Sequence, residues 1–344
     1  MKHAISTLIL ISVFSTLLNG QLSVREKRDM DRFYNAGVEQ LRENDYIEAI
    51  TSFDECLGID STHAKAYMNR GRVKAALGDH EGAINDLGQA IRFDQDLGEA
   101  FFYKGYFLYG KDTTSLPVEL LKASISKGFE MPQAHYLIGL EYLESGEDDK
   151  ALISFNKAIR QKDDFALAYH ERAGIKRKMG DFNGALYDYK SAVNYREDFP
   201  VAFNNMGSVK IVLGDFEGAI QDFSTAIEQS SDLHLAYNNR GYANYQLGNL
   251  DTALEDFRKA ITLQPAFMEA KLNTASVLTK LDQLDESLAM LDQVIQENPE
   301  EGELYLNRGL VKEMKGEVIE ACNDWNKALE LGEEQATEYL KECK

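Results

Sequence analysis

Residues 234–267, HLAYNNRGYANYQLGNLDTALEDFRKAITLQPAF, carry a pattern that recurs through most of the chain. Aligning the glycines gives a period of 34 residues, which holds without insertion from Met30 to Gln335. A fixed period of this length is typical of proteins built from stacked structural repeats. The period divides the chain into nine repeats: 30–63, 64–97, 98–131, 132–165, 166–199, 200–233, 234–267, 268–301 and 302–335.

The apolar positions within a repeat predict two helices. The fourth position is aromatic in seven repeats, the eighth is glycine in seven, the twentieth is alanine in seven, and the twenty-fourth is always large and apolar. Positions 4, 7, 8 and 11 share one face of a first helix, and positions 20, 24, 27 and 28 share one face of a second. Position 15 is Gly, Asn or Asp, which suits the turn between them. Each repeat is therefore predicted to be an antiparallel helix pair.

These positions carry a resemblance to a known family. The series that resembles a tetratricopeptide repeat is Tyr237, Gly241, Gly248, Ala253, Phe257, Ala260 and Pro265. The likeness extends over 306 of the 344 residues. It implies an all-α fold, a right-handed α-solenoid superhelix of stacked antiparallel helix pairs. In that family the first helices line a concave groove that receives extended peptides or partner helices.

Two repeats depart from the pattern. Repeat 98–131 has Pro117 where alanine is expected, so its second helix should start late, with Ser115 as cap and Pro117 in the first turn. Repeat 268–301 keeps its apolar spacing, but it has unusual residues at signature positions, namely Lys271, Ala275, Asp282 and Ser287. Both repeats are expected to bend locally without losing their helices.

The N-terminal segment is predicted to be a signal peptide, residues 1–20. Lys2 precedes an uncharged apolar run from Ala4 to Leu18, and cleavage is expected after Gly20. An uncleaved anchor stays open, because Leu18 is not small. The mature chain is thus expected to be exported, periplasmic or secreted, without membrane insertion. Residues 21–29 are polar and are expected to form a frayed lead-in.

Residues 336–344 are expected to form a capping helix, because a terminal repeat needs a cover for its last interface. Its apolar stripe is Ala336, Tyr339, Leu340 and Cys343. Cys322 and Cys343 lie ten residues before and eleven after Gly332, so antiparallel helices joined there would bring them to one height. An exported protein permits oxidation. We predict a disulfide, with two buried thiols as the alternative. Cys56 is interpreted as a buried substitute for alanine.

Signatures of catalysis, metal binding and cofactor binding are absent from the sequence. The six histidines are scattered, and neither a His-Glu-x-x-His nor a Gly-x-Ser-x-Gly motif occurs. Gly105–Lys111 imitates a phosphate loop, but Asp112 stands where Ser or Thr must reach magnesium. The net charge of −20 disfavours nucleic acid. We predict no enzyme, no cofactor and no metal.

Positions 2, 5, 9, 12 and 13 of each repeat are expected to project into the groove. They include six basic and six acidic residues, so the groove is near neutral. Aromatic residues can bury apolar side chains, asparagines can bond an extended backbone, and cations can pair with carboxylates. The candidates are the aromatic patch Phe102, Tyr106, Tyr109 and Tyr136, and, from repeats 166–267, His170, Arg177, Lys178, Asn204, Asn238, Tyr242 and Tyr245.

The sequence therefore predicts a non-enzymatic scaffold that binds a protein or peptide segment with apolar and acidic residues. One alternative is a structural module that associates with itself, and a lesser one is a glycan-binding accessory protein. For the tyrosines, the alternative is that they only pack against neighbouring helices.

Overall fold

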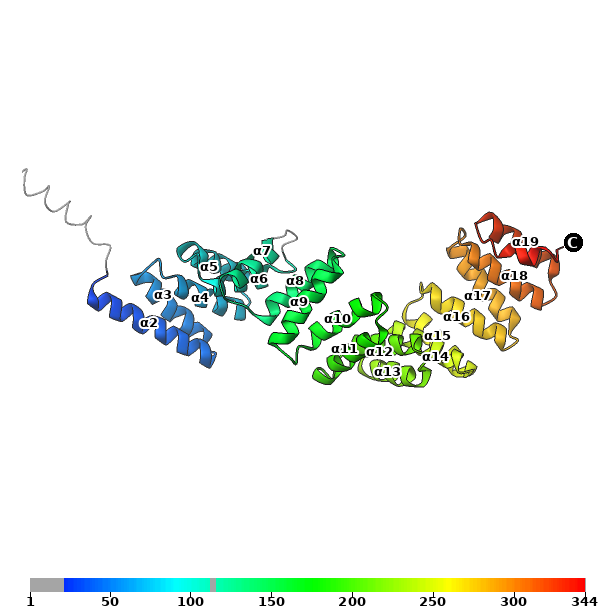
Figure 1. The fold of residues 1–344 in the computed structure, drawn as a ribbon, viewed down its shortest axis with the longest axis horizontal. Coiled ribbons are helices and arrows are strands. Elements are labelled where there is room, and N and C mark those ends of the chain that lie inside the picture. The colour runs from blue at the N-terminus through cyan, green and yellow to red at the C-terminus, as the bar shows by residue number, and fades with distance from the viewer. Residues whose placement is uncertain (1–21, 112–115, 344) are drawn as a thin grey trace, which may run out of the picture. The chain divides into compact units, whose positions relative to one another are not determined.

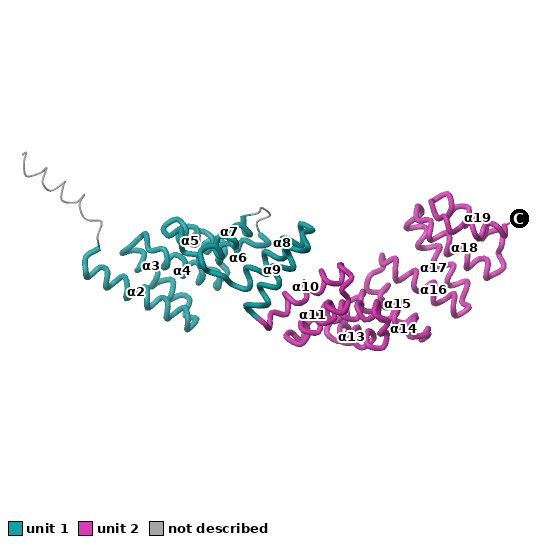
Figure 2. The backbone as a smooth tube through the Cα atoms, viewed as in Figure 1, with its two compact units in different colours: residues 1–162 teal, residues 163–344 magenta. Residues whose placement is uncertain are grey.

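The computed structural model describes residues 22–111 and 116–343, and within these ranges every regular element is a helix (Figure 1). The expected signal peptide and the expected cap Ser115 lie outside the described residues. The chain forms two compact units, residues 1–162 and 163–344 (Figure 2). Within each unit, consecutive helices pack side by side as antiparallel pairs.

The first helices of the repeats are α2 (Val24–Glu43), α4 (Ala64–Ala76), α6 (Gly98–Leu108), α8 (Pro132–Glu144), α10 (Ala166–Lys178), α12 (Pro200–Val212), α14 (His234–Gln246), α16 (Met268–Lys280) and α18 (Gly302–Met314). The second helices are α3 (Tyr46–Ile59), α5 (His80–Phe93), α7 (Leu116–Ser126), α9 (Asp148–Gln161), α11 (Phe182–Tyr195), α13 (Phe216–Gln229), α15 (Leu250–Leu263), α17 (Leu284–Glu297) and α19 (Val318–Glu330). The short α20 (Ala336–Leu340) follows.

The turn inside a repeat is encoded locally. In the repeats whose turn the structure describes, position 15 takes a left-handed backbone, for example at Gly214 with φ 80°, and Asn44 and Asp282 do so without being glycine. Such a residue ends the first helix. At the next position the carboxylate of Asp215 accepts a hydrogen bond of 2.9 Å from the Gly218 amide and so caps the second helix. Two adjacent residues thus stop one helix and start the next.

Close approach of the two helices depends on the eighth-position glycine. A Cβ added to Gly207 would lie 2.7 Å from Cε1 of Phe223, whose ring is fully buried. The same relation joins Gly139 to Phe155. The aromatic ring at position 24 therefore occupies the volume that the missing side chain leaves.

A second, polar contact joins the helices of four repeats. An arginine at position 7 makes two hydrogen bonds of 2.6–2.9 Å to a buried aspartate at position 23. The pairs are Arg70–Asp86, Arg172–Asp188, Arg240–Asp256 and Arg308–Asp324. Arg70 and Arg308 also reach Asp54 and Asp292 on the preceding second helix. Each guanidinium therefore fills the space between helices and neutralises the buried carboxylate.

Successive first helices are also joined by hydrogen bonds between residues 35 apart. The amide at position 6 of one repeat donates to position 5 of the repeat before it. Asn239 donates to Asn204 over 3.1 Å, and Asn273 donates to Asn238 over 3.0 Å. These bonds hold neighbouring first helices in register within the C-terminal unit.

Two boundaries differ from expectation, and the late start of α7 agrees with it. The expected lead-in 21–29 is wrong for residues 24–29, which already belong to α2, because Ser23 and Glu26 form a reciprocal capping box. Helix α7 has Pro117 in its first turn, as predicted. Helix α20 ends at Leu340, although the cap was expected to continue to residue 344.

The C-terminal cap joins α19 through two contacts. The structure bonds Cys322 to Cys343 with their Cα atoms 5.8 Å apart. The ring of Tyr339 stacks on Trp325 with centroids 5.2 Å apart. Cys56 is buried and free. The cap therefore covers the apolar end of the last repeat.

Repeat 268–301 keeps both helices despite its unusual residues. Lys271 is 2% exposed and its Nζ lies 2.7–2.8 Å from both carboxylate oxygens of Glu297. Ser287 donates to the carbonyl oxygen of Ala275 over 3.0 Å. The polar substitutions are thus satisfied inside the repeat.

Among the described helices, none combines the length and the apolar character needed to span a bilayer.

Candidate functional site

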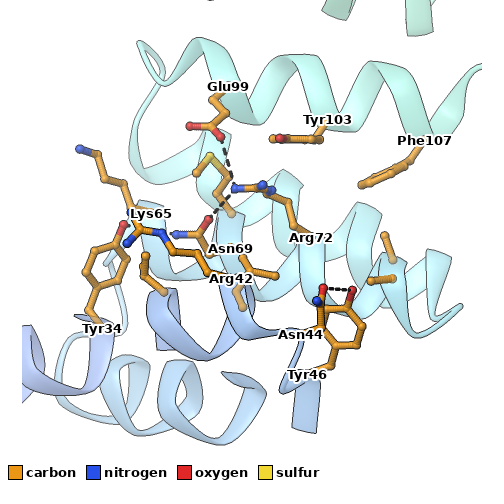
Figure 3. A pocket seen from close by; sticks show the side chains of 15 residues that line it. Tyr34, Arg42, Asn44, Tyr46, Lys65, Asn69, Arg72, Glu99, Tyr103 and Phe107 are labelled. Carbon is orange, nitrogen blue, oxygen red and sulfur yellow. Dashed lines mark hydrogen bonds and ion pairs between the residues drawn. The ribbon is translucent and has the colours of Figure 1, made fainter. Parts of the chain in front are cut away.

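A cavity of about 710 Å³ lies between the first helices α2, α4 and α6 of the N-terminal unit (Figure 3). Consecutive repeats place the same face of each first helix side by side, so the cavity is a groove across three helices. Its lining comprises Tyr34, Val38, Leu41, Arg42, Asn44, Tyr46, Lys65, Met68, Asn69, Arg72, Ala75, Ala76, Glu99, Tyr103 and Phe107.

A line of hydrogen bonds crosses the floor of this groove. Asn69 on α4 donates from Nδ2 to the hydroxyl oxygen of Tyr34 on α2 over 3.3 Å. Arg72 donates from Nη1 to Oδ1 of Asn69 over 3.2 Å, and the same nitrogen lies 3.5 Å from Oε1 of Glu99 on α6 (Figure 3). Each of the three helices contributes to the line, which therefore fixes the position of the Arg72 guanidinium.

Aromatic rings form one wall beside Arg72. Its guanidinium carbon lies 4.6 Å from the ring centroid of Tyr103, and the ring of Phe107 stacks on that of Tyr103 with centroids 6.0 Å apart. Burial raises the pKa of Tyr34 and of Tyr103 above the ordinary tyrosine value. Both phenols therefore stay neutral near pH 7 and keep their capacity to donate hydrogen bonds.

The groove is positive in an acidic protein. Its lining contains three cations, Arg42, Lys65 and Arg72, and one carboxylate, Glu99. Arg42 is 72% exposed and pairs with Glu39 outside the lining at 3.2 Å, while Lys65 is exposed at the edge. Apolar side chains, among them Leu41 and Met68, separate these charges. The arrangement suits a ligand with both carboxylates and apolar groups.

The expected aromatic patch of the N-terminal unit is only partly accessible. Phe102 is 4% exposed and stacks under Tyr106 with centroids 5.8 Å apart, which corrects the expectation that it faces the groove. Tyr106 is 45% exposed. Tyr109 caps α6, and burial, with help from Glu144 and Glu141, raises its pKa to about 12. Tyr136 is half-buried, 5.9 Å from Phe155.

The candidates of the C-terminal unit likewise comprise buried and exposed side chains. His170 packs against Phe199 with centroids 4.9 Å apart and lies 3.2 Å from the Nδ2 atom of Asn205. Asn204 and Asn238 are buried and accept the bonds between first helices described above. These three side chains therefore contact neighbouring helices. The sequence analysis had instead predicted that they bind a ligand.

Four candidates of the C-terminal unit stay at or near the surface. Arg177, Lys178 and Tyr242 are exposed. Tyr245 is half-buried under Lys280, whose Nζ atom lies 4.0 Å from the ring centroid. Tyr245 and Lys280 also line a smaller cavity of about 230 Å³.

Sequence reasoning did not select the cations of the 710 Å³ groove. Arg42, Lys65 and Arg72 all stand at expected groove positions, in two consecutive repeats. In these two repeats the groove positions hold three cations and one acid, Asp31. This excess of cations was the signal available in the sequence. Whether the helices that carry these cations enclose a cavity depends on how they pack, which the repeat pattern does not predict.

In the described part of the chain, no group of three His, Cys, Asp or Glu side chains is arranged to hold a metal ion.

Fold and sequence together define a helical-repeat protein. Family models described as "Tetratricopeptide repeat" match residues 31–63, 64–97, 132–165 and 234–267, and one described as "TPR repeat" matches 212–248. The chain is a tetratricopeptide-repeat protein. The count of nine repeats comes from the sequence period and stays a prediction.

Curated relatives share short stretches with the chain. "Tetratricopeptide repeat protein 36" of Xenopus tropicalis is 31% identical over 104 residues, which is 28% of this chain and 50% of that protein. A homologue from Nematostella vectensis is 33% identical over 64 residues, 19% of this chain and 35% of the relative. The chain thus spans half or less of the length of these relatives.

Solved structures share the fold. The structure titled "Crystal structure of APC/C hetero-tetramer Cut9-Hcn1" contains a chain with a TM-score of 0.52 and 13% identity, covering 92% of this chain and 84% of that one. The structure titled "Crystal structure of YrrB: a TPR protein with an unusual peptide-binding site" has a TM-score of 0.47 and 21% identity, over 54% of this chain and 97% of that one.

Proposed function

We propose that this protein is a non-enzymatic interaction scaffold and that the groove of α2, α4 and α6 binds an extended segment with acidic and apolar residues. The observation that supports the proposal is the lining of the 710 Å³ cavity, which combines three cations with apolar and aromatic side chains. Tetratricopeptide-repeat proteins bind protein partners, which supports a partner of this class.

The groove offers separate contacts to the two kinds of side chain. A carboxylate of the bound segment can reach the exposed Lys65 and Arg42, which carry mobile ammonium and guanidinium groups. Apolar side chains can lie against Leu41 and Phe107, which line the same cavity. Because the hydrogen bond to Asn69 and the ring of Tyr103 already hold Arg72, little conformational entropy is lost when a ligand contacts it.

The bound segment is expected to compete with Glu99 for Arg72. The Arg72–Glu99 pair is loose at 3.5 Å and both side chains are about one third exposed. A ligand carboxylate can therefore approach the free edge of the guanidinium without first breaking a tight buried pair.

We also propose that the protein is exported. The apolar run after Lys2 and the cysteine pair Cys322–Cys343, bonded in the structure, support this location. Mass spectrometry of the protein isolated from its source tests it, because cleavage after Gly20 leaves Gln21 as the first residue. A full-length mass would contradict cleavage.

The binding proposal is tested by selecting peptides from a random library with the purified protein and measuring the affinity of the enriched peptides by fluorescence polarisation. We expect enrichment of peptides that alternate acidic and apolar residues. Lys65→Glu and Arg72→Glu should each weaken binding about tenfold or more, which corresponds to losing about 1.4 kcal/mol per charge contact. Added salt should also weaken binding, because the Lys65 and Arg42 charges are exposed.

Arg160→Glu is the matched control. Arg160 is exposed on the second helix α9 and is not part of the groove lining. Arg160→Glu changes the charge by the same amount but outside the groove. The affinity of this variant for the peptides should therefore equal that of the unmodified protein. Equal affinity of all three variants, or enrichment of peptides without acidic residues, would overturn the assignment of this groove. Sedimentation at several concentrations reveals self-association, the competing function.

A further inference from the structure

The space that arginine occupies in four repeats is filled differently in repeat 132–165. In those four repeats the arginine at position 7 pairs with the aspartate at position 23, as Arg308 does with Asp324. In repeat 132–165 these positions are Ile138 and Ser154. The repeat therefore lacks both the guanidinium and the carboxylate that close this face in the following repeat, where Arg172 pairs with Asp188.

The surrounding charges are inverted as well. Position 25 of the preceding repeat is Asp54 for Arg70 and Asp292 for Arg308, and both contact the arginine. For repeat 132–165 the corresponding residue is Lys122 on α7. A lysine thus stands where an acid stands beside Arg70 and Arg308 and where Ser224 stands beside Arg240, and it faces a repeat without an acid at position 23.

A cavity of about 330 Å³ remains at this place, between α7, α8 and α9 of the N-terminal unit. Its lining contains three lysines and no carboxylate, and comprises Lys122, Ile125, His135, Ile138, Tyr142, Lys150, Ile153, Ser154 and Lys157. None of these residues lines the groove of α2, α4 and α6. The cavity is therefore a separate feature.

Aromatic and apolar groups form the middle of the cavity. Nζ of Lys122 lies 5.6 Å and Nζ of Lys150 lies 5.3 Å from the ring centroid of Tyr142. Ile153 is 57% exposed, so an apolar surface is open to solvent between the lysines. A ligand here would meet ammonium groups at the rim and aliphatic groups in the centre.

The positive charge of the cavity is limited. Lys122 lies 3.1 Å from Glu119, and Lys150 pairs with Glu147. His135 is buried and its Nε2 atom lies 2.5 Å from Oε1 of Glu130. Lys157 is exposed at the rim. Because neighbouring acids already offset part of the lysine charge, a single carboxylate matches the site better than a phosphate dianion.

We propose that this cavity is a second binding site, which takes a carboxylate side chain adjacent to an apolar side chain on an acidic peptide segment of a partner protein. The carboxylate takes the place that the position-23 aspartate has in four other repeats, and the lysines pair with it. The apolar side chain covers Ile153 and the ring of Tyr142. A segment bound here leaves every lining residue of the α2, α4 and α6 groove free.

The probe is the labelled peptide acetyl-Leu-Glu-Phe-Glu-Leu-amide, and its glutamine counterpart is the reference. Binding is measured by fluorescence polarisation with the full chain, and the contacted lysines are mapped by carbodiimide crosslinking of ammonium to carboxylate groups followed by mass spectrometry. We expect the glutamate peptide to bind at least about tenfold more tightly than the glutamine peptide. Crosslinks should fall on Lys122, Lys150 or Lys157.

The decisive variant installs the arrangement of the other repeats. Ile138→Arg combined with Ser154→Asp restores the pair seen at Arg308 and Asp324, so it should close the cavity without disturbing the helices. Measured in the Arg72→Glu background, where binding to the first groove is weakened, it should lower affinity about tenfold or more and remove the crosslinks. Lys157→Gln at the exposed rim is the second variant, for use if the double variant folds poorly, and it should also weaken binding.

Arg72→Glu in the first groove separates this proposal from the proposed function. It should leave the mapped crosslinks at Lys122, Lys150 and Lys157 unchanged. Crosslinks confined to Lys65, undiminished binding by both the double variant and Lys157→Gln, or no binding of the glutamate peptide would each overturn the second site. Displacement of the peptide by inorganic phosphate at equal concentration would also overturn it, since the cavity would then be a phosphate site.

Discussion

At the scale of single residues, two glycines of the first helices face very different surroundings. Gly207 faces the buried ring of Phe223, and an added Cβ would approach it to 2.7 Å. Gly174 lies inside α10, where the nearest atom to an added Cβ is the hydroxyl oxygen of Tyr189 at 3.8 Å. The first glycine is required by packing, whereas the second only adds flexibility to a helix.

We predict opposite effects of Gly→Ala at these two positions. Gly207→Ala should lower the free energy of unfolding by about 1–3 kcal/mol, because the ring of Phe223 has no space to move into. Gly174→Ala should raise it by about 0.5–1 kcal/mol, because alanine favours the helix. Urea unfolding followed by circular dichroism measures both.

Gly207→Ala combined with Phe223→Leu tests the cause. Leucine already stands at the corresponding position opposite Gly71, where an added Cβ would lie 3.2 Å from Cγ of Leu87. The smaller side chain should recover part of the loss. If Gly207→Ala and Gly174→Ala lower the free energy of unfolding equally, steric contact with Phe223 is not the reason that position 207 requires glycine.

At the scale of elements, α20 is stabilised by its contacts with α19, because it is too short to be stable by itself. It has five residues, too few for an isolated helix in water. Its support comes from the bond between Cys322 and Cys343 and from the stacking of Tyr339 on Trp325. The cap should therefore loosen when the disulfide is removed.

Cys343→Ser is predicted to destabilise the last repeat by about 3 kcal/mol, because the disulfide closes a loop with a sequence separation of 21. Trp325 is the only tryptophan of the chain and is 1% exposed, so its fluorescence reports on this repeat. We expect the tryptophan transition to move to lower urea, while most of the far-ultraviolet circular dichroism signal is retained.

Cys56→Ala provides the matched control, since Cys56 is buried in α3 without a bond. It should leave the tryptophan transition in place. A tryptophan transition that Cys343→Ser does not move would show that stacking alone holds the cap.

At the scale of the whole molecule, the net charge of −20 opposes the folded state through repulsion among carboxylates. The ion pairs that counter it are partly buried, as in Arg308–Asp324 with side chains 17% and 6% exposed. Salt screens exposed charges more strongly than such buried pairs. Screening should therefore remove more repulsion than attraction.

We predict that raising sodium chloride from about 0.02 M to about 0.5 M increases the midpoint of thermal unfolding, since the Debye length then falls well below the spacing of most surface charges. Circular dichroism measures the midpoint, and an uncharged osmolyte at equal osmolarity serves as control. A midpoint that falls with salt would mean that exposed ion pairs, such as Arg258–Glu286, contribute more than the repulsion.

Much of the helix architecture could be predicted because its determinants are local. The turn at Gly214 and the cap at Asp215 are adjacent in sequence, and the first helices from α4 to α18 each begin at the first residue of a repeat. The beginning of α2 could not be placed, because the capping box of Ser23 and Glu26 lies outside the repeat pattern.

The sequence by itself determined the class of fold, because a helix pair that packs only on its neighbours is specified by a short, repeated pattern of apolar, small and turn residues. The tertiary structure decided which polar groove residues are accessible. Asn204 and Asn238 bond to residues 35 positions away, whereas Lys65 and Arg42 stay exposed beside a cavity. That difference depends on the distance between successive first helices, which follows from the fit of side chains in three dimensions.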